Sequence, residues 1–197
     1  MYQHFFKRLL DIIGSLIILP FVLLEIFFLS PIIWLTDKGP VFYNGERVGK
    51  DFKVFRMFKL RSMYVNAPDL RNEDGSTFNS ENDPRVTPIG RFLRKTSLDE
   101  FPQFLNVLVG DMSFIGPRPA TKMIFDEQLD DTMKKHFQVK PGVTGYTQAY
   151  LRNAVEKKQR YEMDAYYADN LSFSLDVKII LKTISTVLSS KNIYHNK

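Results

Sequence analysis

The sequence contains no cysteine, which excludes disulfide bonds and thiolate metal sites and is compatible with a reducing, cytoplasm-facing location. It has only three histidines, His4, His136 and His195, and their scatter along the chain does not favour a histidine-based zinc site. Internal repeats and low-complexity tracts are also absent. A chain of 197 residues is long enough for one domain with its own core and an appended membrane element.

Acidic residues are in deficit, because 22 Asp and Glu stand against 27 Lys and Arg, for a net charge of +5. This balance predicts an anionic partner, such as a phosphate substrate, an acidic membrane surface or nucleic acid. Nucleic-acid binding ranks last, because the cations are spread along the chain and do not form a basic stripe on one element.

Charge is almost absent from residues 12–36, where Glu25 is the only charged side chain. As a helix this stretch would measure roughly 37 Å, enough to cross a bilayer core of about 30 Å. A cleavable signal peptide is disfavoured, because the apolar run is longer than such a segment and lacks a clear small-residue cleavage site. Glu25 is costly at the bilayer centre and easier to accommodate near an interface or against protein.

The flanks of this stretch are basic on both sides, and two prolines interrupt it. Lys7 and Arg8 precede it, and seven cations follow it: Lys38, Arg47, Lys50, Lys53, Arg56, Lys59 and Arg61. The positive-inside tendency places both ends in the cytoplasm, so the segment has to bend inside the membrane. We therefore expect a re-entrant helix-break-helix over residues 1–37, with its main bend at Pro20 and with Pro31 ending or redirecting the second arm. An ordinary anchor that spans the bilayer is the alternative.

Residues 38–190 are expected to form a compact α/β domain, mostly helical with one short hairpin, followed by a tail at 191–197. Aromatic and β-branched residues at 41–43 and 52–58, separated by turn residues, indicate the hairpin. The polar stretch 66–88 is typical of a long functional loop. Charged or amphipathic patterns predict helices over 126–137, 156–169 and 171–188, and the last could pack on the core or lie in the membrane interface.

The adjacent carboxylates Asp99 and Glu100 follow the cations Arg91, Arg94 and Lys95. The proline three residues after Asp99 predicts that an apolar helix starts at the dyad, where free amides and the positive dipole end favour carboxylates and phosphates. The structural alternative is a Ser-x-x-Glu capping box, in which Ser97 and Glu100 cap the start of an ordinary helix. Neighbouring carboxylates on a helix point about 100° apart and suit two different tasks.

Taken in order, the blocks of this chain resemble those of the bacterial sugar transferases, small monotopic phosphoglycosyl transferases that act on polyprenol phosphate. The match begins with a basic N-terminus and Asp11 before the proline-interrupted apolar segment. It continues through Lys38-Gly39-Pro40-Val41-Phe42, Phe58-Lys59-Leu60-Arg61-Ser62-Met63, Ser97-Leu98-Asp99-Glu100, Asn106-Val107-Leu108-Val109-Gly110-Asp111-Met112-Ser113, Gly116-Pro117-Arg118-Pro119 and Pro141-Gly142-Val143-Thr144-Gly145. Each block alone is weak evidence for the resemblance, but the blocks together, in this order, are highly specific for the family. In the family, a Ser-Pro pair commonly breaks the apolar segment near its middle, whereas here Ser30-Pro31 lies close to its end.

The resemblance implies a protein on the cytoplasmic face of the bacterial inner membrane that never crosses the bilayer. It implies transfer of a phospho-sugar from a uridine diphosphate sugar to undecaprenyl phosphate with release of UMP, the first membrane step of glycan assembly. Asp99 would be the nucleophile that forms a covalent phospho-sugar intermediate. A carboxylate that attacks a diphosphate needs a divalent cation and nearby arginines, so Mg²⁺ held by Asp99 and Glu100 is expected. The candidate substrate-binding residues are Arg94, Arg118, Lys59, Arg61 and Arg152.

No residue pattern identifies the sugar, and specificity is expected in the loop 66–88 and in the region after Arg118. A peripheral protein that binds acidic lipid without catalysis is the alternative from another class. It accounts for the basic flanks and the amphipathic C-terminal segment, but not for the dyad, the arginines and the stiff Gly-Pro-Arg-Pro turn together.

Overall fold

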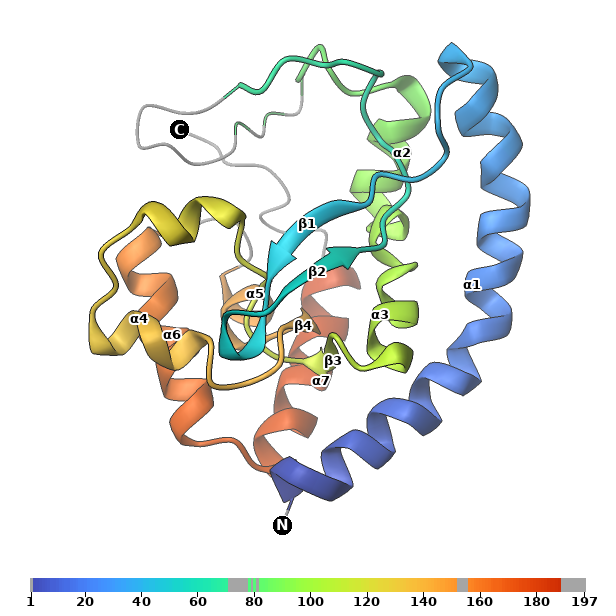
Figure 1. Ribbon diagram of the computed structural model, residues 1–197. Coiled ribbons are helices and arrows are strands. Elements are labelled where there is room, and N and C mark those ends of the chain that lie inside the picture. The colour runs from blue at the N-terminus through green and yellow to red at the C-terminus, as the bar shows by residue number, and fades with distance from the viewer. Residues whose placement is uncertain (1, 71–77, 79, 81, 152–155, 189–197) are drawn as a thin grey trace.

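The computed structural model describes residues 2–70, 78, 80, 82–151 and 156–188, and these residues form a mostly helical fold with two short sheets. After a short π-helix at Tyr2–Phe6, the α-helices are α1 (Lys7–Asp37), α2 (Pro88–Thr96), α3 (Gln103–Val109), α4 (Asp131–His136), α5 (Tyr146–Tyr150), α6 (Lys157–Asp169) and α7 (Phe173–Leu188). The strands are β1 (Gly45–Val48), β2 (Val54–Met57), β3 (Ser113–Ile115) and β4 (Gly142–Thr144). Helix α1 runs along one side of the other elements (Figure 1).

Helix α1 is continuous, so the expected break between two arms is wrong. Its 31 residues include both Pro20 and Pro31, and Figure 1 shows a curved ribbon without an interruption. Each proline removes one backbone donor, and a long helix absorbs such losses by bending. In the described part of the chain α1 is the one helix long and apolar enough to cross a membrane, and only 11% of its most apolar stretch is buried.

The N-terminal end of α1 is fastened to the domain by buried polar contacts. The carboxylate of Asp11 accepts hydrogen bonds of 3.0 Å from Ser113 Oγ and from the backbone nitrogen of Phe114. Lys7 Nζ lies 2.7 Å from Asp176 Oδ2 on α7. These contacts join the first turns of α1 to β3 and to the C-terminal helix.

The C-terminal end of α1 is fastened as well. Arg61 donates from both terminal nitrogens to the carboxylate of Asp37, the last residue of α1. Beside this pair, Ile33 of α1 is buried with Leu60 and Leu93. Both ends of the apolar helix therefore contact the same domain.

A hairpin is present as predicted and β2 lies within the expected strand 52–58, but β1 does not overlap the expected strand 41–43. Strands β1 and β2 are antiparallel, with Gly45 opposite Met57 and Val48 opposite Val54. The 41–43 segment adds only an isolated bridge between Phe42 and Leu60. The parallel pair β3–β4 was not predicted, because each strand has three residues and lies in a segment whose glycines and prolines are typical of turns.

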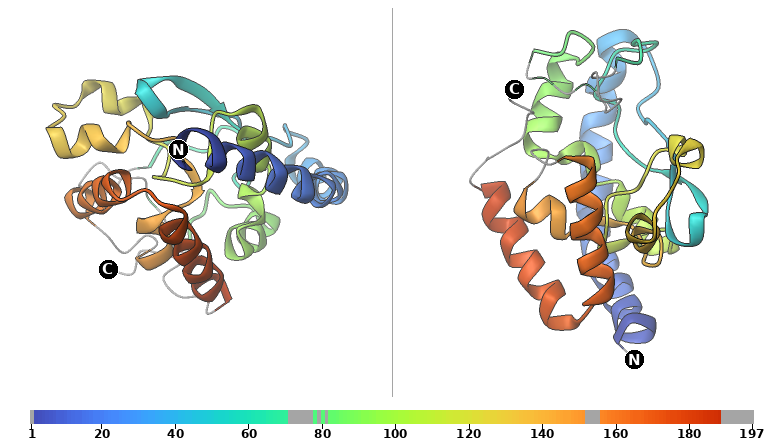
Figure 2. Two further views of the ribbon diagram at one scale, coloured as in Figure 1. Left: turned by 90° about the horizontal axis from the view of Figure 1, so that it is seen from below. Right: turned by 90° about the vertical axis from the view of Figure 1, so that its left-hand side faces the viewer.

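The predicted C-terminal helices are confirmed as α6 and α7, and Figure 2 shows the short α5 between them. The helix expected over 126–137 is shorter, since a 3-10 turn at Lys122–Asp126 precedes α4. Helix α2, which lies between the expected loop and the dyad, was not predicted, and most of the central part of loop 66–88 lies outside the described residues. The tail 191–197 lies outside them too.

The apolar residues of α7 divide between two faces. Ile179 is fully buried against Tyr167 and Ile115 in the core, whereas Leu181 and Ile184 are exposed. The helix therefore packs on the core and also presents apolar side chains outward.

Candidate active site

Asp99 and Glu100 lie in a 3-10 turn, Leu98–Glu100, between α2 and α3. The sequence placed them in the first turn of the apolar helix, but Pro102 is the N-cap of α3 and the dyad precedes it. Ser97 does not form the alternative capping box: its backbone is left-handed with φ 60°, it closes α2, and its side chain makes no cap hydrogen bond. The dyad is thus held by a tight turn between two helices.

Lys59 bridges the two carboxylates. Its Nζ lies 2.8 Å from Asp99 Oδ2 and 3.2 Å from Glu100 Oε1. The backbone supports this contact, because the nitrogen of Leu60 donates a 3.0 Å hydrogen bond to the carbonyl oxygen of Asp99. Asp99 is only 2% exposed, so Lys59 offsets its negative charge in a largely desolvated place.

Arg118 approaches Glu100 from the turn that follows β3, with Nη2 3.2 Å from Glu100 Oε1. Its side chain is half exposed to solvent. Burial alone would raise the pKa of Glu100, but the charges and hydrogen bonds of Lys59 and Arg118 outweigh it and lower that pKa to about 2. Glu100 is therefore ionised throughout the physiological range.

The carboxylates fit a hard divalent cation. Asp99 Oδ2 is buried, is ion-paired with Lys59 and accepts no hydrogen bond. Among residues 2–70, 78, 80, 82–151 and 156–188, no three His, Asp or Glu side chains group as a metal cage. Asp99 and Glu100 could hold Mg²⁺ with the remaining ligands supplied by phosphate oxygens and water, which is how proteins usually bind this ion.

The other predicted binding residues take different positions. Arg61 is buried and turned toward Asp37, and its Nε donates to the carbonyl of Pro40. Arg94, in the last turn of α2, donates from Nε to Ser62 Oγ at 3.0 Å. Arg152 lies outside the described residues. The structure thus brings Lys59 and Arg118 to the dyad and directs Arg61 to α1.

Asn106 is a positioning residue that the sequence analysis did not single out. It is completely buried in α3, where its amide oxygen accepts from the nitrogen of Phe58 and its amide nitrogen donates to the carbonyl of Arg56, both at 2.8 Å. These bonds fix the backbone just before Lys59. An amide in the middle of the apolar run of α3 was the available signal, because buried polar groups are retained where they have partners.

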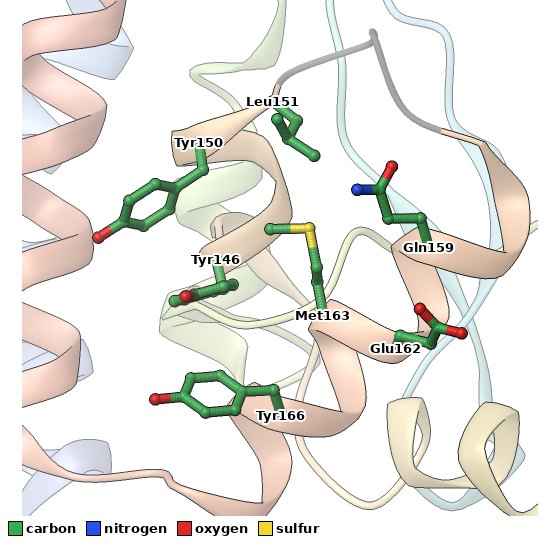
Figure 3. A pocket seen from close by; sticks show the side chains of 7 residues that line it. All are labelled: Tyr146, Tyr150, Leu151, Gln159, Glu162, Met163 and Tyr166. Carbon is green, nitrogen blue, oxygen red and sulfur yellow. The ribbon is translucent and has the colours of Figure 1, made fainter.

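A pocket lies apart from this charged cluster, between α5 and α6 (Figure 3). None of Lys59, Asp99, Glu100 and Arg118 contributes to it. The rings of Tyr146 and Tyr166 lie 5.2 Å apart, centroid to centroid, along one side of it. Its lining consists of Tyr146, Tyr150, Leu151, Gln159, Glu162, Met163 and Tyr166.

Comparison with known proteins identifies relatives along nearly the whole chain. A galactosyl transferase, CpsE, of Streptococcus agalactiae serotype III (strain NEM316) is 41% identical over 196 residues, which cover 95% of this chain and 43% of the relative. A UDP-glucose:undecaprenyl-phosphate glucose-1-phosphate transferase of Klebsiella pneumoniae is 40% identical over 198 residues, covering 96% of this chain and 41% of the relative. An uncharacterized sugar transferase, EpsL, of Bacillus subtilis (strain 168) is 38% identical over 187 residues, which cover 95% of this chain and 89% of the relative.

The chain spans less than half the length of the first relatives it matches. The model of the bacterial sugar transferase family matches residues 2–190, which include α1, the dyad and the turn that carries Arg118. On this match the chain belongs to the bacterial sugar transferase family.

Proposed function

We propose that this protein is a phosphoglycosyl transferase that moves a phospho-sugar from a UDP-sugar to undecaprenyl phosphate and releases UMP. The observation that carries the proposal is the buried Asp99, paired at 2.8 Å with Lys59 beside Glu100 and Arg118. Support comes from the names of relatives, such as the Klebsiella transferase that uses UDP-glucose and undecaprenyl phosphate. Names of relatives mention galactose, N-acetylgalactosamine and glucose, so they leave the sugar open.

In the proposed first step, a carboxylate oxygen of Asp99 attacks the phosphorus that bears the sugar. A bond forms between Asp99 and phosphorus, the bond from that phosphorus to the oxygen of UMP breaks, and UMP leaves with the electron pair. The carboxylate and the diphosphate repel each other, and Lys59 and Arg118 offset that repulsion. Glu100 orients both cations through the contacts described above.

In the proposed second step, a phosphate oxygen of the lipid acceptor attacks the same phosphorus. The bond between Asp99 and phosphorus breaks, its electron pair returns to the carboxylate, and a lipid-linked diphosphate sugar is formed. Asp99 and Glu100 would hold Mg²⁺, which when bound neutralises negative charge on the diphosphate. Arg94 and Arg152 are proposed to contact the donor nucleotide or its phosphates. Arg61 is proposed to act indirectly, by fixing the end of α1 through its hydrogen bonds to Asp37.

We also propose that residues 1–37 dip into the membrane as one curved helix, without a break, and return to the face they entered. The support is that both ends of α1 contact the same domain, through Lys7 and Asp11 at one end and Asp37 at the other. A helix that crossed the bilayer would carry one of these ends, and its partners, to the opposite side. Residues 38–190 would then form the catalytic domain on the cytoplasmic face of the inner membrane.

The test is to incubate membranes containing the protein with Mg²⁺, undecaprenyl phosphate and a radiolabelled UDP-sugar, across a panel of sugars. UMP release and labelled lipid are expected for one or more donors, and Asp99→Asn should abolish both. Full activity of that variant would refute the assignment of the nucleophile. A lipid-binding protein without catalysis would release no UMP from any donor.

A further inference from the structure

Glu25 is a carboxylate on α1 that the steps above do not use. Both of its oxygens are buried, and neither has a hydrogen-bond partner among the residues that the structure describes. An ionised carboxylate in an apolar setting is costly unless another group satisfies it. A partner supplied by a ligand would relieve that cost.

The position of Glu25 on α1 brings it toward the dyad. Its neighbour Ile26 and Leu98, which directly precedes Asp99, both pack against the same buried apolar cluster around Leu60. Asp99 lies close enough to Glu25 for its charge to act on it. Glu25 is thus a buried carboxylate of the apolar helix within range of the charge on the dyad.

The other charged groups of this cluster are already engaged with one another. Lys59 contacts Asp99 and Glu100, and Arg118 contacts Glu100. After the first step Asp99 is bonded to phosphorus and cannot accept a proton. Glu25 is then a carboxylate close to the dyad that no described cation contacts.

We propose that Glu25 is the base that accepts a proton from the phosphate of the lipid acceptor. This inference rests on the proposed function and concerns only its second step. A phosphate monoester enters a negatively charged site more easily as the monoanion, because like charges disfavour the second ionisation. The proton of its P–OH group passes to a Glu25 oxygen as the phosphate oxygen bonds to phosphorus and the Asp99 bond breaks. Glu25 later loses that proton to water.

The two steps can be measured separately in vesicles that contain the protein. Without acceptor, a burst of UMP equal to the amount of enzyme reports the first step, and added undecaprenyl phosphate then reports the second. We expect Glu25→Gln to keep the burst and to slow transfer to lipid by at least about tenfold at pH 7, as for loss of a general base. The defect should shrink toward pH 8.5, because the second ionisation of a phosphate monoester, with an ordinary pKa of about 6 that nearby negative charges raise, is then complete and the acceptor needs no base.

Glu25→Asp and Glu25→Leu are the matched comparisons. Asp retains a carboxylate and is expected to recover part of the transfer at pH 7, whereas Leu fits the apolar helix and should be as slow as Gln. If Glu25 has no role in the second step, the Gln and Leu variants will transfer to lipid as fast as the unaltered protein at every pH. That result overturns the inference. A defect independent of pH, or loss of the burst in Glu25→Gln, also overturns it. Absence of the burst in the unaltered protein would instead refute the proposed function.

Discussion

Arg61 donates one hydrogen bond of 2.6 Å from each terminal nitrogen to the carboxylate of Asp37. This fork joins the end of the apolar helix to the chain segment that also carries Lys59, two residues earlier. The nitrogen of Leu60, between those two cations, donates to the carbonyl of Asp99. The position of α1 and the position of the dyad are therefore set by the same short segment.

Asp37→Asn should destabilise the fold, because it leaves the buried guanidinium of Arg61 without its negative partner. Breaking one side of a buried ion pair costs about 3 kcal/mol or more. The thermal unfolding midpoint of the purified protein in detergent measures the loss. Asp131→Asn is the control, since its pair with Lys134 is exposed to solvent and its loss should leave the midpoint nearly unchanged. Equal midpoints for the two variants would contradict the structural role of the fork.

Lys59→Met should slow UMP release by about 10²-fold to 10³-fold, the usual effect of losing one charge-stabilising donor in an active site. Methionine keeps the apolar stem of Lys59 but removes the cation that lies between Asp99 and Glu100. The rate of the UMP burst measures the effect. Lys59→Arg keeps the charge and should retain more activity than the Met variant. A Met variant as fast as the unaltered protein would show that the bridge has no role in the reaction.

Glu100 should contribute stability that disappears in acid. Its pKa is lowered from 4.5 to about 2, because Lys59 and Arg118 outweigh the effect of burial. The unfolded chain takes up this proton at higher pH than the folded chain, so the contribution is full above about pH 4.5 and is lost as the pH falls toward 2. The difference in unfolding midpoint between the unaltered protein and Glu100→Gln should be constant from pH 7 to 5 and smaller at pH 3. A difference in midpoint that grew as the pH fell would contradict the lowered pKa of Glu100.

The sequence predicts the features that depend on local pattern. The apolar run around Glu25, the two C-terminal helices and the hairpin each have a characteristic residue spacing, and all appear in the structure. The dyad was located because two adjacent carboxylates near a proline stand out in an apolar stretch. Its exact setting was missed, since Ser97 adopts a left-handed conformation that ends α2 before the dyad.

Features that depend on contacts between distant segments could not be predicted. The bonds of Asn106 to the strand before Lys59, and the fork between Asp37 and Arg61, join residues far apart in sequence. The continuity of α1 through Pro20 was also missed, because proline disfavours a helix locally, whereas the contacts that fix both ends of α1 join it to distant segments. Local preference therefore fails where tertiary contacts decide the outcome.

Gly116→Ala should displace Arg118 and reduce both stability and activity. A Cβ atom at this position would lie 2.1 Å from the carbonyl oxygen of Lys140 and 2.9 Å from the nitrogen of Gly142. Both are backbone atoms, so β3 and β4 would have to separate, and the 2.9 Å hydrogen bond from the Gly116 nitrogen to Thr144 would be strained. The turn that carries Arg118 begins at this residue.

We expect the Gly116→Ala variant to unfold at a lower temperature and to release UMP at least about tenfold more slowly, since small misplacements of a binding group cost this much or more. Gly45→Ala is the matched control, because the atoms nearest its added Cβ belong to the side chains of Tyr43 and Arg47. Those side chains can turn aside, whereas the backbone across from Gly116 cannot. If both variants behaved alike, close packing of β3 on β4 would not be what holds Arg118 against Glu100.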